Sequence, residues 1–299
     1  MTTLTQVYGA GEPLIYDLPY YSRKEIIVLS GQDLAPNTVL GRTSVSAAIA
    51  VASAANAGNG AMGAITIGKD AVAGVYRLVV LEPGTNTGDF GLYAPDGSLV
   101  GIGTVASAFV STHLSFTLAD DTDFAGGDVF SIYTNAVAGV AGGGNTGTGV
   151  ISVAQYEPWA LPGVYTLTCT AAASNSGTFS VVGPDGVEIG PATVAVEFRG
   201  GGLRFTITDD TDFIVGDTFT ITIPVGKYKA WNPTNTDGSS KVAGILLNAV
   251  DASAGDAPGT AIVRHATVNP AELVYYSGAT EGAKRDALGG LAALGITTR

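Results

Sequence analysis

One stretch of the sequence occurs twice, and this duplication constrains the fold more than any other feature of the 299 residues. From Gly74 to Ile132 the first copy matches the second without a gap at an offset of 89 residues, and the pentapeptide DDTDF recurs at Asp120 and Asp209. Upstream, GAITI (Gly63–Ile67) pairs with GVISV (Gly149–Val153) at an offset of 86, which predicts three additional residues in the second copy. Such a period is typical of tandem folding units, here of about 80 residues each.

Each copy has the pattern of short strands separated by turns. In LSFTL (Leu114–Leu118) and VYTLTCT (Val164–Thr170), apolar residues alternate with polar ones, which indicates strands with one buried face. Turn sequences such as PDG, NTG and NSG lie between the strands. We therefore expect a mainly β protein with two tandem antiparallel β-sandwich repeats of immunoglobulin-like type, at residues 57–137 and 143–225.

The pentapeptide DDTDF has three possible roles: a metal loop, a site of catalytic carboxylates, or a turn. In both copies it follows a strand and precedes Gly-Asp and the next strand, so it occupies a connection. Aspartate side chains accept local backbone hydrogen bonds in turns. A calcium loop would require more oxygen ligands and a bidentate glutamate. We predict a turn whose phenylalanine packs back onto the core, with a weak metal site as the alternative.

The other reactive side chains lack the partners that catalysis or metal binding requires. His113 and His265 lie far apart, without a nearby cysteine or serine pattern. Cys169 is the single cysteine, which excludes an intramolecular disulfide. Its counterpart in the first copy is Val80, so we expect a buried core side chain. The sequence predicts no enzyme, no catalytic residues, no cofactor and no metal site.

The negative charge of the protein is concentrated in the repeats. Residues 44–225 carry 4 of the 14 basic and 16 of the 26 acidic residues, which equals the whole net charge of −12, so the flanks sum to zero. Such a field opposes nucleic-acid binding. No apolar run is long enough to cross a bilayer, and the N-terminus lacks the features of a signal peptide. We expect neither a nucleic-acid nor a membrane partner.

The two flanks are predicted to form one small β-rich α+β domain from residues 25–43 and 226–299, split by the repeats. In the second flank, the pattern predicts strands over Val242–Leu247 and Thr260–Val268. A helix is predicted over Thr280–Leu294, with Gly295 as its stop.

Four segments of this split domain follow one another in a specific order. They are LAPNTVLGR (34–42), KYKAWNPTNTDGSSKVAGILL (227–247), TAIVRHATVNPAELVYY (260–276) and ALGGLAALGI (287–296). In this order they resemble the lambda-type phage head decoration protein family. The resemblance implies a structural virion protein, made in the host cytoplasm, that binds the outer surface of the capsid head. It also implies a homotrimer at threefold sites that cements the shell, with the major capsid protein as partner and no enzymatic activity.

An N-terminal arm, residues 1–24, is expected to fasten onto the major capsid protein. Pro13 and Pro19 disfavour helix, and an extended peptide binds well by adding to a sheet edge of a partner. The candidate capsid-contact residues are Leu14, Ile15, Tyr16, Leu18, Tyr20 and Tyr21. The alternative is that these residues pack on their own domain.

Two other functions are compatible with a pair of acidic sandwiches, which we expect to project outward from the capsid. The first is a phage adhesin or tail-fibre module in which the repeats bind a host-surface glycan, although Trp159 is the single tryptophan that the repeats offer as a sugar platform. The second is a glycan-processing enzyme, which would need paired carboxylates in a cleft. The split domain shows no such pair.

Overall fold

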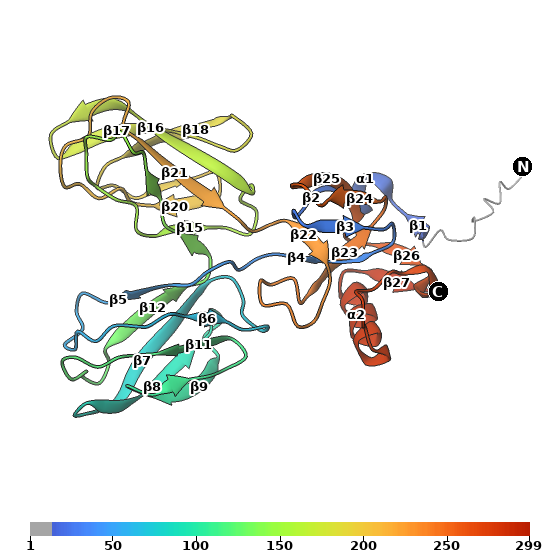
Figure 1. Ribbon diagram of the computed structural model, residues 1–299, viewed down its shortest axis with the longest axis horizontal. Coiled ribbons are helices and arrows are strands. Elements are labelled where there is room, and N and C mark those ends of the chain that lie inside the picture. The colour runs from blue at the N-terminus through green and yellow to red at the C-terminus, as the bar shows by residue number, and fades with distance from the viewer. Residues whose placement is uncertain (1–13) are drawn as a thin grey trace, which may run out of the picture. The chain divides into compact units, whose positions relative to one another are not determined.

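The computed structural model describes residues 14–299, which divide into two compact units (Figure 1). The split unit comprises the chain up to Thr43 and from Lys227 onward, and the repeat unit comprises Ser44–Gly226. The protein is mainly β, with several antiparallel sheets, as expected from the sequence. Among the described residues, no helix combines the length and the apolar character needed to cross a membrane.

A closed five-stranded barrel with the order β2–β22–β4–β23–β25 forms the centre of the split unit. Its strands are β2 (Arg23–Val28), β4 (Val39–Arg42), β22 (Tyr228–Ala230), β23 (Val242–Leu246) and β25 (Ala257–Ile262). Alternate residues of each strand face one side. Ile26, Val28 and Leu40 are accordingly buried with Tyr228 in one hydrophobic cluster.

Further strands and helices surround the barrel within the split unit. β1 (Leu14–Asp17), β26 (Ala266–Val268) and β27 (Ile296–Thr298) form a sheet in that order, and β3 (Gln32–Leu34) pairs with β24 (Val250–Ala252). The helices are α1 (Pro19–Ser22), the short 3-10 helix η1 (Pro270–Glu272) and α2 (Glu281–Ala293).

The C-terminal helix is confirmed, whereas one predicted strand is interrupted. Thr280 caps α2 by accepting a hydrogen bond from the N–H of Ala283 (3.2 Å), and Gly295 follows the helix at φ +73°. The single strand predicted over Thr260–Val268 is wrong, because it is divided into β25 and β26. His265 adopts φ +42° between them, a left-handed conformation that breaks an extended run.

The repeat unit contains two separate hydrophobic cores, each enclosed by two sheets. The first repeat has the sheets β5–β12–β7–β8–β9 and β10–β11–β6, and the second has β14–β21–β16–β17–β18 and β13–β15–β20–β19. The strands of the first are β5 (Ile49–Ala52), β6 (Thr66–Ile67), β7 (Val75–Gly84), β8 (Thr87–Tyr93), β9 (Leu99–Thr104), β10 (Ala108–Phe109), β11 (Leu114–Thr117) and β12 (Val129–Tyr133). Those of the second are β13 (Ala136–Val137), β14 (Val140–Ala141), β15 (Ala154–Tyr156), β16 (Gly163–Ala173), β17 (Ser176–Val182), β18 (Glu188–Thr193), β19 (Phe198–Gly200), β20 (Leu203–Phe205) and β21 (Thr218–Ile223).

The strand pairs of the two repeats correspond at a constant offset of 89 residues. Ile67 pairs with Leu114 in the first repeat, and Tyr156 pairs with Leu203 in the second. The offset of 86 predicted for GAITI is therefore wrong, and the second repeat has no three-residue insertion at this point. A short alternating pattern can be matched in more than one way, whereas pairing with the opposite strand selects a single register.

In each repeat, a buried aspartate just before the last strand binds the segment that follows the first strand of the five-stranded sheet. The Asp128 carboxylate accepts three backbone hydrogen bonds, from the N–H groups of Ala57 (3.0 Å), Gly58 (2.9 Å) and Ala125 (3.0 Å). Burial raises the pKa of this carboxyl, but the three donors together outweigh burial, and the pKa is lowered. Asp217 accepts the same three bonds at the equivalent positions of the second repeat, and its pKa is lowered for the same reasons.

The repeat unit leaves and re-enters the split unit at neighbouring positions. The backbone N–H of Thr43 donates to the carbonyl oxygen of Lys227 (2.9 Å), and the N–H of Lys227 donates to Oγ1 of Thr43 (3.1 Å). The adjoining pair, Arg42 and Tyr228, belongs to the antiparallel ladder of β4 and β22. Residues 44–226 thus occupy the place of a hairpin loop between these two strands.

Candidate functional site

The six candidate contact residues lie in residues 14–22, which we call the arm segment. The preceding part of the predicted arm, residues 1–13, lies outside the described residues. β1 pairs antiparallel with β26, with Asp17 opposite Ala266, and α1 follows as one helical turn. The expectation that Pro19 keeps the arm free of helix is wrong. Proline fits the first helical position because the N–H that it lacks would have no helical partner there.

Hydrogen bonds hold the arm segment against the loop between β25 and β26. The hydroxyl of the buried Ser22 donates to the carbonyl oxygen of His265 (2.7 Å) and accepts from the N–H of Leu18 (3.1 Å). Nε of Arg23 donates to Oδ2 of Asp17 at 2.6 Å, and this bond raises the pKa of the guanidinium. These bonds fix the arm segment on the split unit.

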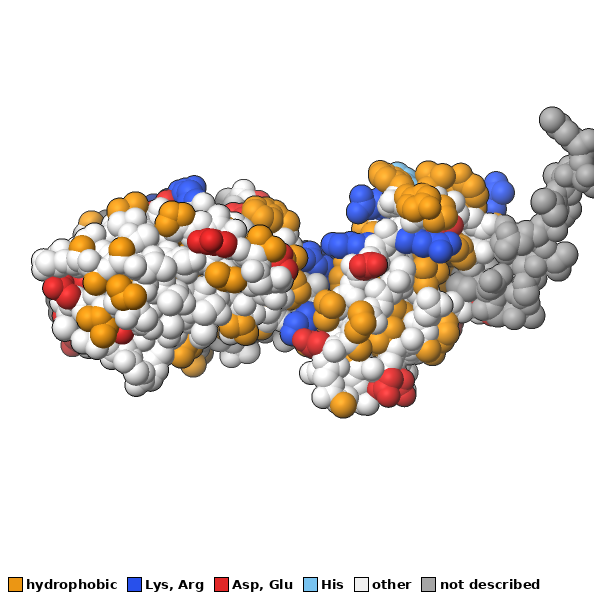
Figure 2. All heavy atoms as spheres, turned by 90° about the horizontal axis from the view of Figure 1, so that it is seen from above, with side chains coloured by type: hydrophobic (Ala, Val, Ile, Leu, Met, Phe, Trp, Pro, Cys, Tyr) orange, Lys and Arg blue, Asp and Glu red, His pale blue; other side chains and the backbone are white. Residues whose placement is uncertain are grey.

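Four of the six candidate side chains remain accessible to a partner. Leu14 packs against the core beside α2, and Ile15 is half-buried. The exposed four are Tyr16 (59%), Leu18 (47%), Tyr21 (50%) and Tyr20, which is fully exposed. Hydrophobic side chains cluster on the surface of the split unit seen in Figure 2. Large apolar side chains exposed together on an ordered segment are typical of an interaction surface.

Tyr21 is flanked by two residues of the loop between β25 and β26. The guanidinium carbon of Arg264 lies 5.3 Å from the centroid of the tyrosine ring, and the ring centroid of His265 also lies 5.3 Å away. A cation over an aromatic face is attracted by the ring quadrupole. These contacts orient Tyr21 while half of its surface stays accessible.

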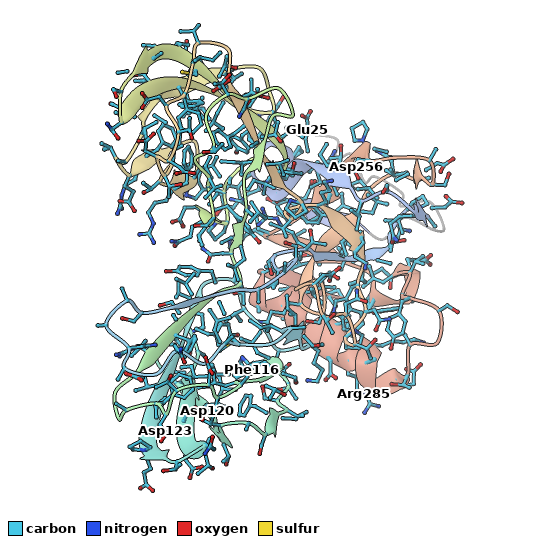
Figure 3. All side chains as sticks on the ribbon, turned by 60° about the vertical axis from the view of Figure 1, so that its left-hand side comes forward. Glu25, Phe116, Asp120, Asp123, Asp256 and Arg285 are labelled. Carbon is cyan, nitrogen blue, oxygen red and sulfur yellow. The ribbon has the colours of Figure 1, made fainter. Side chains whose placement is uncertain are left out.

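The acidic pentapeptides form turns, as predicted. Oδ1 of Asp123 accepts a hydrogen bond from the N–H of Asn86 (2.8 Å), and Phe124 is buried in the core. The second repeat has the same bond and the same buried phenylalanine. Asp120 lies at the same end of the first repeat (Figure 3), and its buried carboxylate oxygens have no hydrogen-bond partner among the described residues. Within residues 14–299, no group of three or more His, Cys, Asp or Glu side chains could hold a metal ion.

His113 and Cys169 have packing roles. The hydroxyl of Tyr76 lies 3.0 Å from Nδ1 of His113, whereas the equivalent Tyr165 donates to the carbonyl oxygen of Gly201 (3.2 Å). Because a backbone oxygen serves equally well in the second repeat, this contact requires no histidine chemistry. Cys169 is buried, as predicted, and burial raises the pKa of its thiol, which disfavours the reactive thiolate.

Sequence reasoning missed two features of these sites. The buried aspartates Asp128 and Asp217 carry a visible signal, because Gly-Asp recurs before a strand in both copies. The contacts of Tyr21 with Arg264 and His265 carry no such signal, because they join parts of the chain more than 240 positions apart in sequence.

Residues 3–296 match the family model described as bacteriophage lambda head decoration protein D. No curated protein matches the chain. Among solved structures, FlgL from Xanthomonas campestris is 20% identical, with a TM-score of 0.24 over 32% of this chain and 32% of that chain. The flagellar hook junction protein FlgK from Burkholderia pseudomallei is 18% identical, with a TM-score of 0.23 over 67% of this chain and 43% of that chain. The matches thus span less than half of either flagellar protein, and similarity at these TM-scores supports no inference about fold or function.

Proposed function

Because the chain belongs to the bacteriophage lambda head decoration protein D family, it is a capsid-associated virion protein, and we propose that it binds the outer surface of the head. We assign the contact with the major capsid protein to the arm segment. Three copies assemble at each threefold site, with the repeats directed outward. The protein then stabilises the shell against internal pressure, and this role requires no catalysis.

The observation that carries this proposal is the exposure of Tyr16, Leu18 and Tyr20 on a backbone that is already held in place. An ordered segment loses less conformational entropy on binding than a free arm does. Among residues 14–299, β1 is also an edge strand of its sheet, and an extended segment of the capsid protein can add to such an edge through backbone hydrogen bonds. Aromatic side chains beside such an edge supply the apolar centre of an interface.

Binding alone accounts for cementing. A protein that binds the assembled shell and not its free subunits adds its binding free energy to the assembled state. A trimer that bridges several capsid subunits gains further from multivalency, since the second and third contacts form at high effective concentration. The shell is therefore stabilised without any covalent step.

Co-sedimentation with undecorated, expanded phage capsids tests the proposal. The full chain should bind saturably, and the double substitution Leu18→Ser and Tyr20→Ser should weaken binding at least about tenfold by removing apolar interface contacts. Val110→Ser is the matched control, because Val110 is an exposed apolar residue of the first repeat. Point substitutions are preferable to removal of residues 1–24, which would delete Arg23 and Lys24 from β2.

Two outcomes would contradict the proposal at different levels. If the double variant binds as tightly as the full chain, the contact lies outside the arm segment. If the full chain does not bind any capsid, the decoration role itself is wrong. Light scattering of the free protein and of protein released from capsids tests the trimer separately.

A shortened chain tests whether the repeats are needed for attachment. Since Thr43 and Lys227 are hydrogen-bonded neighbours, residues 44–226 can be replaced by the dipeptide Asn-Gly to close a hairpin between β4 and β22. We expect this chain to fold and to bind capsids with unchanged affinity. Loss of binding by a folded shortened chain would assign the contact to the repeats.

A glycan-binding role of the second repeat is the alternative, and the exposure of Trp159 favours it. This side chain is 69% exposed, whereas the equivalent position in the first repeat is Asp70. An amphipathic aromatic ring on a surface is suited to contacts with a ligand that is partly apolar and partly polar. Glycan-array binding that is lost in Trp159→Ala would support this role, and an array without any hit would remove it.

A further inference from the structure

Three cationic side chains come together at one end of the barrel in the split unit. Lys24 lies two residues before the buried Ile26 on β2, and Arg42 lies two residues after the buried Leu40 on β4. Alternate residues of a strand face the same side. Lys24 and Arg42 therefore lie on the same side of their strands as the buried Ile26 and Leu40, at the end of the barrel. Arg264 follows β25, the antiparallel neighbour of β2, and is exposed. We call these three residues the cationic end.

The three charges are close enough to affect one another. Burial lowers the pKa of Lys24, and the charges of Arg42 and Arg264 lower it further. The same two arginines act on Tyr228, where burial raises the pKa of the phenol and their charges oppose this rise. Like charges held together in this way destabilise one another, and a bound anion would relieve the repulsion.

The cationic end adjoins the aromatic residues of the arm segment. Arg264 lies over the ring of Tyr21, and the ring centroids of Tyr21 and His265 are 5.3 Å apart. The neighbouring Arg23 forms an ion pair with Asp17 (2.6 Å). On the face seen in Figure 2, Lys and Arg side chains of the split unit lie among hydrophobic ones. Cationic and apolar side chains therefore lie next to each other on this surface.

We propose that the cationic end is a binding site for carboxylate side chains, and that its occupant is a short acidic segment of the capsid protein that also contacts the arm segment. This inference rests on the proposed function and specifies its chemistry. Guanidinium groups bind carboxylates in a bidentate geometry, and aromatic neighbours favour a peptide over a free ion. A nucleic acid does not fit, because the repeats carry the full net charge of −12 and repel a long polyanion.

A titration without capsids tests the site by itself. Deca-glutamate peptide is added to the isotopically labelled full chain, and amide resonances are followed by NMR. We expect shifts centred on Lys24, Arg42 and Arg264, and their loss in Arg264→Glu. Lys24→Gln provides a second, milder variant in case the charge reversal disturbs folding, and it should weaken the response. Arg285→Glu, an exposed residue of α2 (Figure 3), is the matched control and should leave the response unchanged.

Capsid co-sedimentation at increasing salt then tests the partner. Binding of the full chain should weaken as sodium chloride rises, because salt screens partly exposed charges. Arg264→Glu should bind at least about tenfold more weakly at low salt and depend less on salt, as expected for the loss of charge complementarity. Arg285→Glu should behave like the unchanged protein.

The outcomes separate this inference from the decoration role. Full binding by Arg264→Glu and Lys24→Gln, with an unchanged salt dependence, would overturn the carboxylate site and leave the decoration role intact. If the full chain does not bind capsids, the decoration role fails. In that case the peptide titration still decides the site, since shifts outside the cationic end, or shifts that persist in Arg264→Glu, overturn it.

Discussion

In the first repeat, the buried carboxylate that accepts three backbone N–H groups belongs to Asp128, and in the second repeat the equivalent carboxylate belongs to Asp217. Gly60 and Gly149 also occupy equivalent positions, and at each of them the missing side chain leaves room for the ring of a buried phenylalanine. The two repeats thus keep the same buried polar contacts and the same close approaches. These are the interactions whose loss is costly in a protein interior.

The surfaces of the two repeats, in contrast, carry different residues at equivalent positions. Val110, exposed and apolar in the first repeat, corresponds to Arg199, which forms an ion pair with Glu197 (2.7 Å) in the second. On the edge strands, Ile102 of β9 corresponds to Pro191 of β18. The difference indicates that the buried contacts, and not these surface residues, specify the fold that the two repeats share.

The largest expected effect comes from removing the buried carboxylates. Asp128→Ala and Asp217→Ala each leave three backbone N–H groups without an acceptor, and we expect each to lower the free energy of unfolding of its repeat by about 3–5 kcal/mol. Calorimetry of the full chain measures this as an earlier transition of one repeat. Asp121→Ala, an exposed aspartate of the first turn, is the control and should change stability by less than about 0.5 kcal/mol. A large difference between the two repeats would contradict the conclusion that both depend on the same buried contacts.

A methyl group at the close-approach glycines should have the next largest effect. In Gly60→Ala the new Cβ would lie 2.6 Å from the ring of Phe124, and in Gly149→Ala it would lie 2.7 Å from the ring of Phe213. Each also meets a backbone carbonyl oxygen, so we expect a loss of about 2 kcal/mol from overpacking. Gly143→Ala is the control because a Cβ there meets no atom within 4 Å. Urea unfolding measures the three variants.

The lowered pKa of the two carboxyls predicts a loss of stability in acid. Their pKa is lower in the folded than in the unfolded state, so the stabilisation is complete above the unfolded value of about 3.9 and is lost as pH falls through the folded value. Urea unfolding between pH 7 and pH 3 should show this decline. In Asp128→Asn, the part of this decline that comes from the first repeat should be absent. Equal slopes for the variant and the unchanged chain would show that Asp128 is not the titrating group.

Local patterns predicted the parts of the fold that depend on nearby residues. The helix α2 was predicted because capping by Thr280 acts within a few residues. The connection at Asp120–Phe124 was predicted from its place between two strands, although its Asp123 carboxylate accepts a hydrogen bond from the N–H of Asn86, which is 37 residues away. The burial of Cys169 followed from alternation along its strand. The immunoglobulin-like assignment of the repeats stays a prediction.

Long-range contacts account for the errors. The helical turn at Pro19–Ser22 is held by a hydrogen bond to His265, which no local pattern reveals. The register of Thr66–Ile67 is selected by pairing with β11, and the break at His265 belongs to a loop that receives the arm segment. Of the candidate contact residues, the sequence identified the exposed aromatic ones, but not the cations that lie beside them.

The smallest expected effect is an exchange between the two cores. Cys169 is buried on β16, where the first repeat has the buried Val80 on β7. Cys169→Val keeps an apolar side chain of similar size, and we expect a change in the free energy of unfolding of less than about 1.5 kcal/mol. Urea unfolding under reducing conditions checks this, with the reciprocal Val80→Cys as the control. A loss as large as that of Asp217→Ala would mean that the thiol contact with the carbonyl oxygen of Ala171 (3.7 Å) matters more than packing. In that case the side chains of the two cores would not be interchangeable. The repeats would then share only their backbone fold and their buried aspartates.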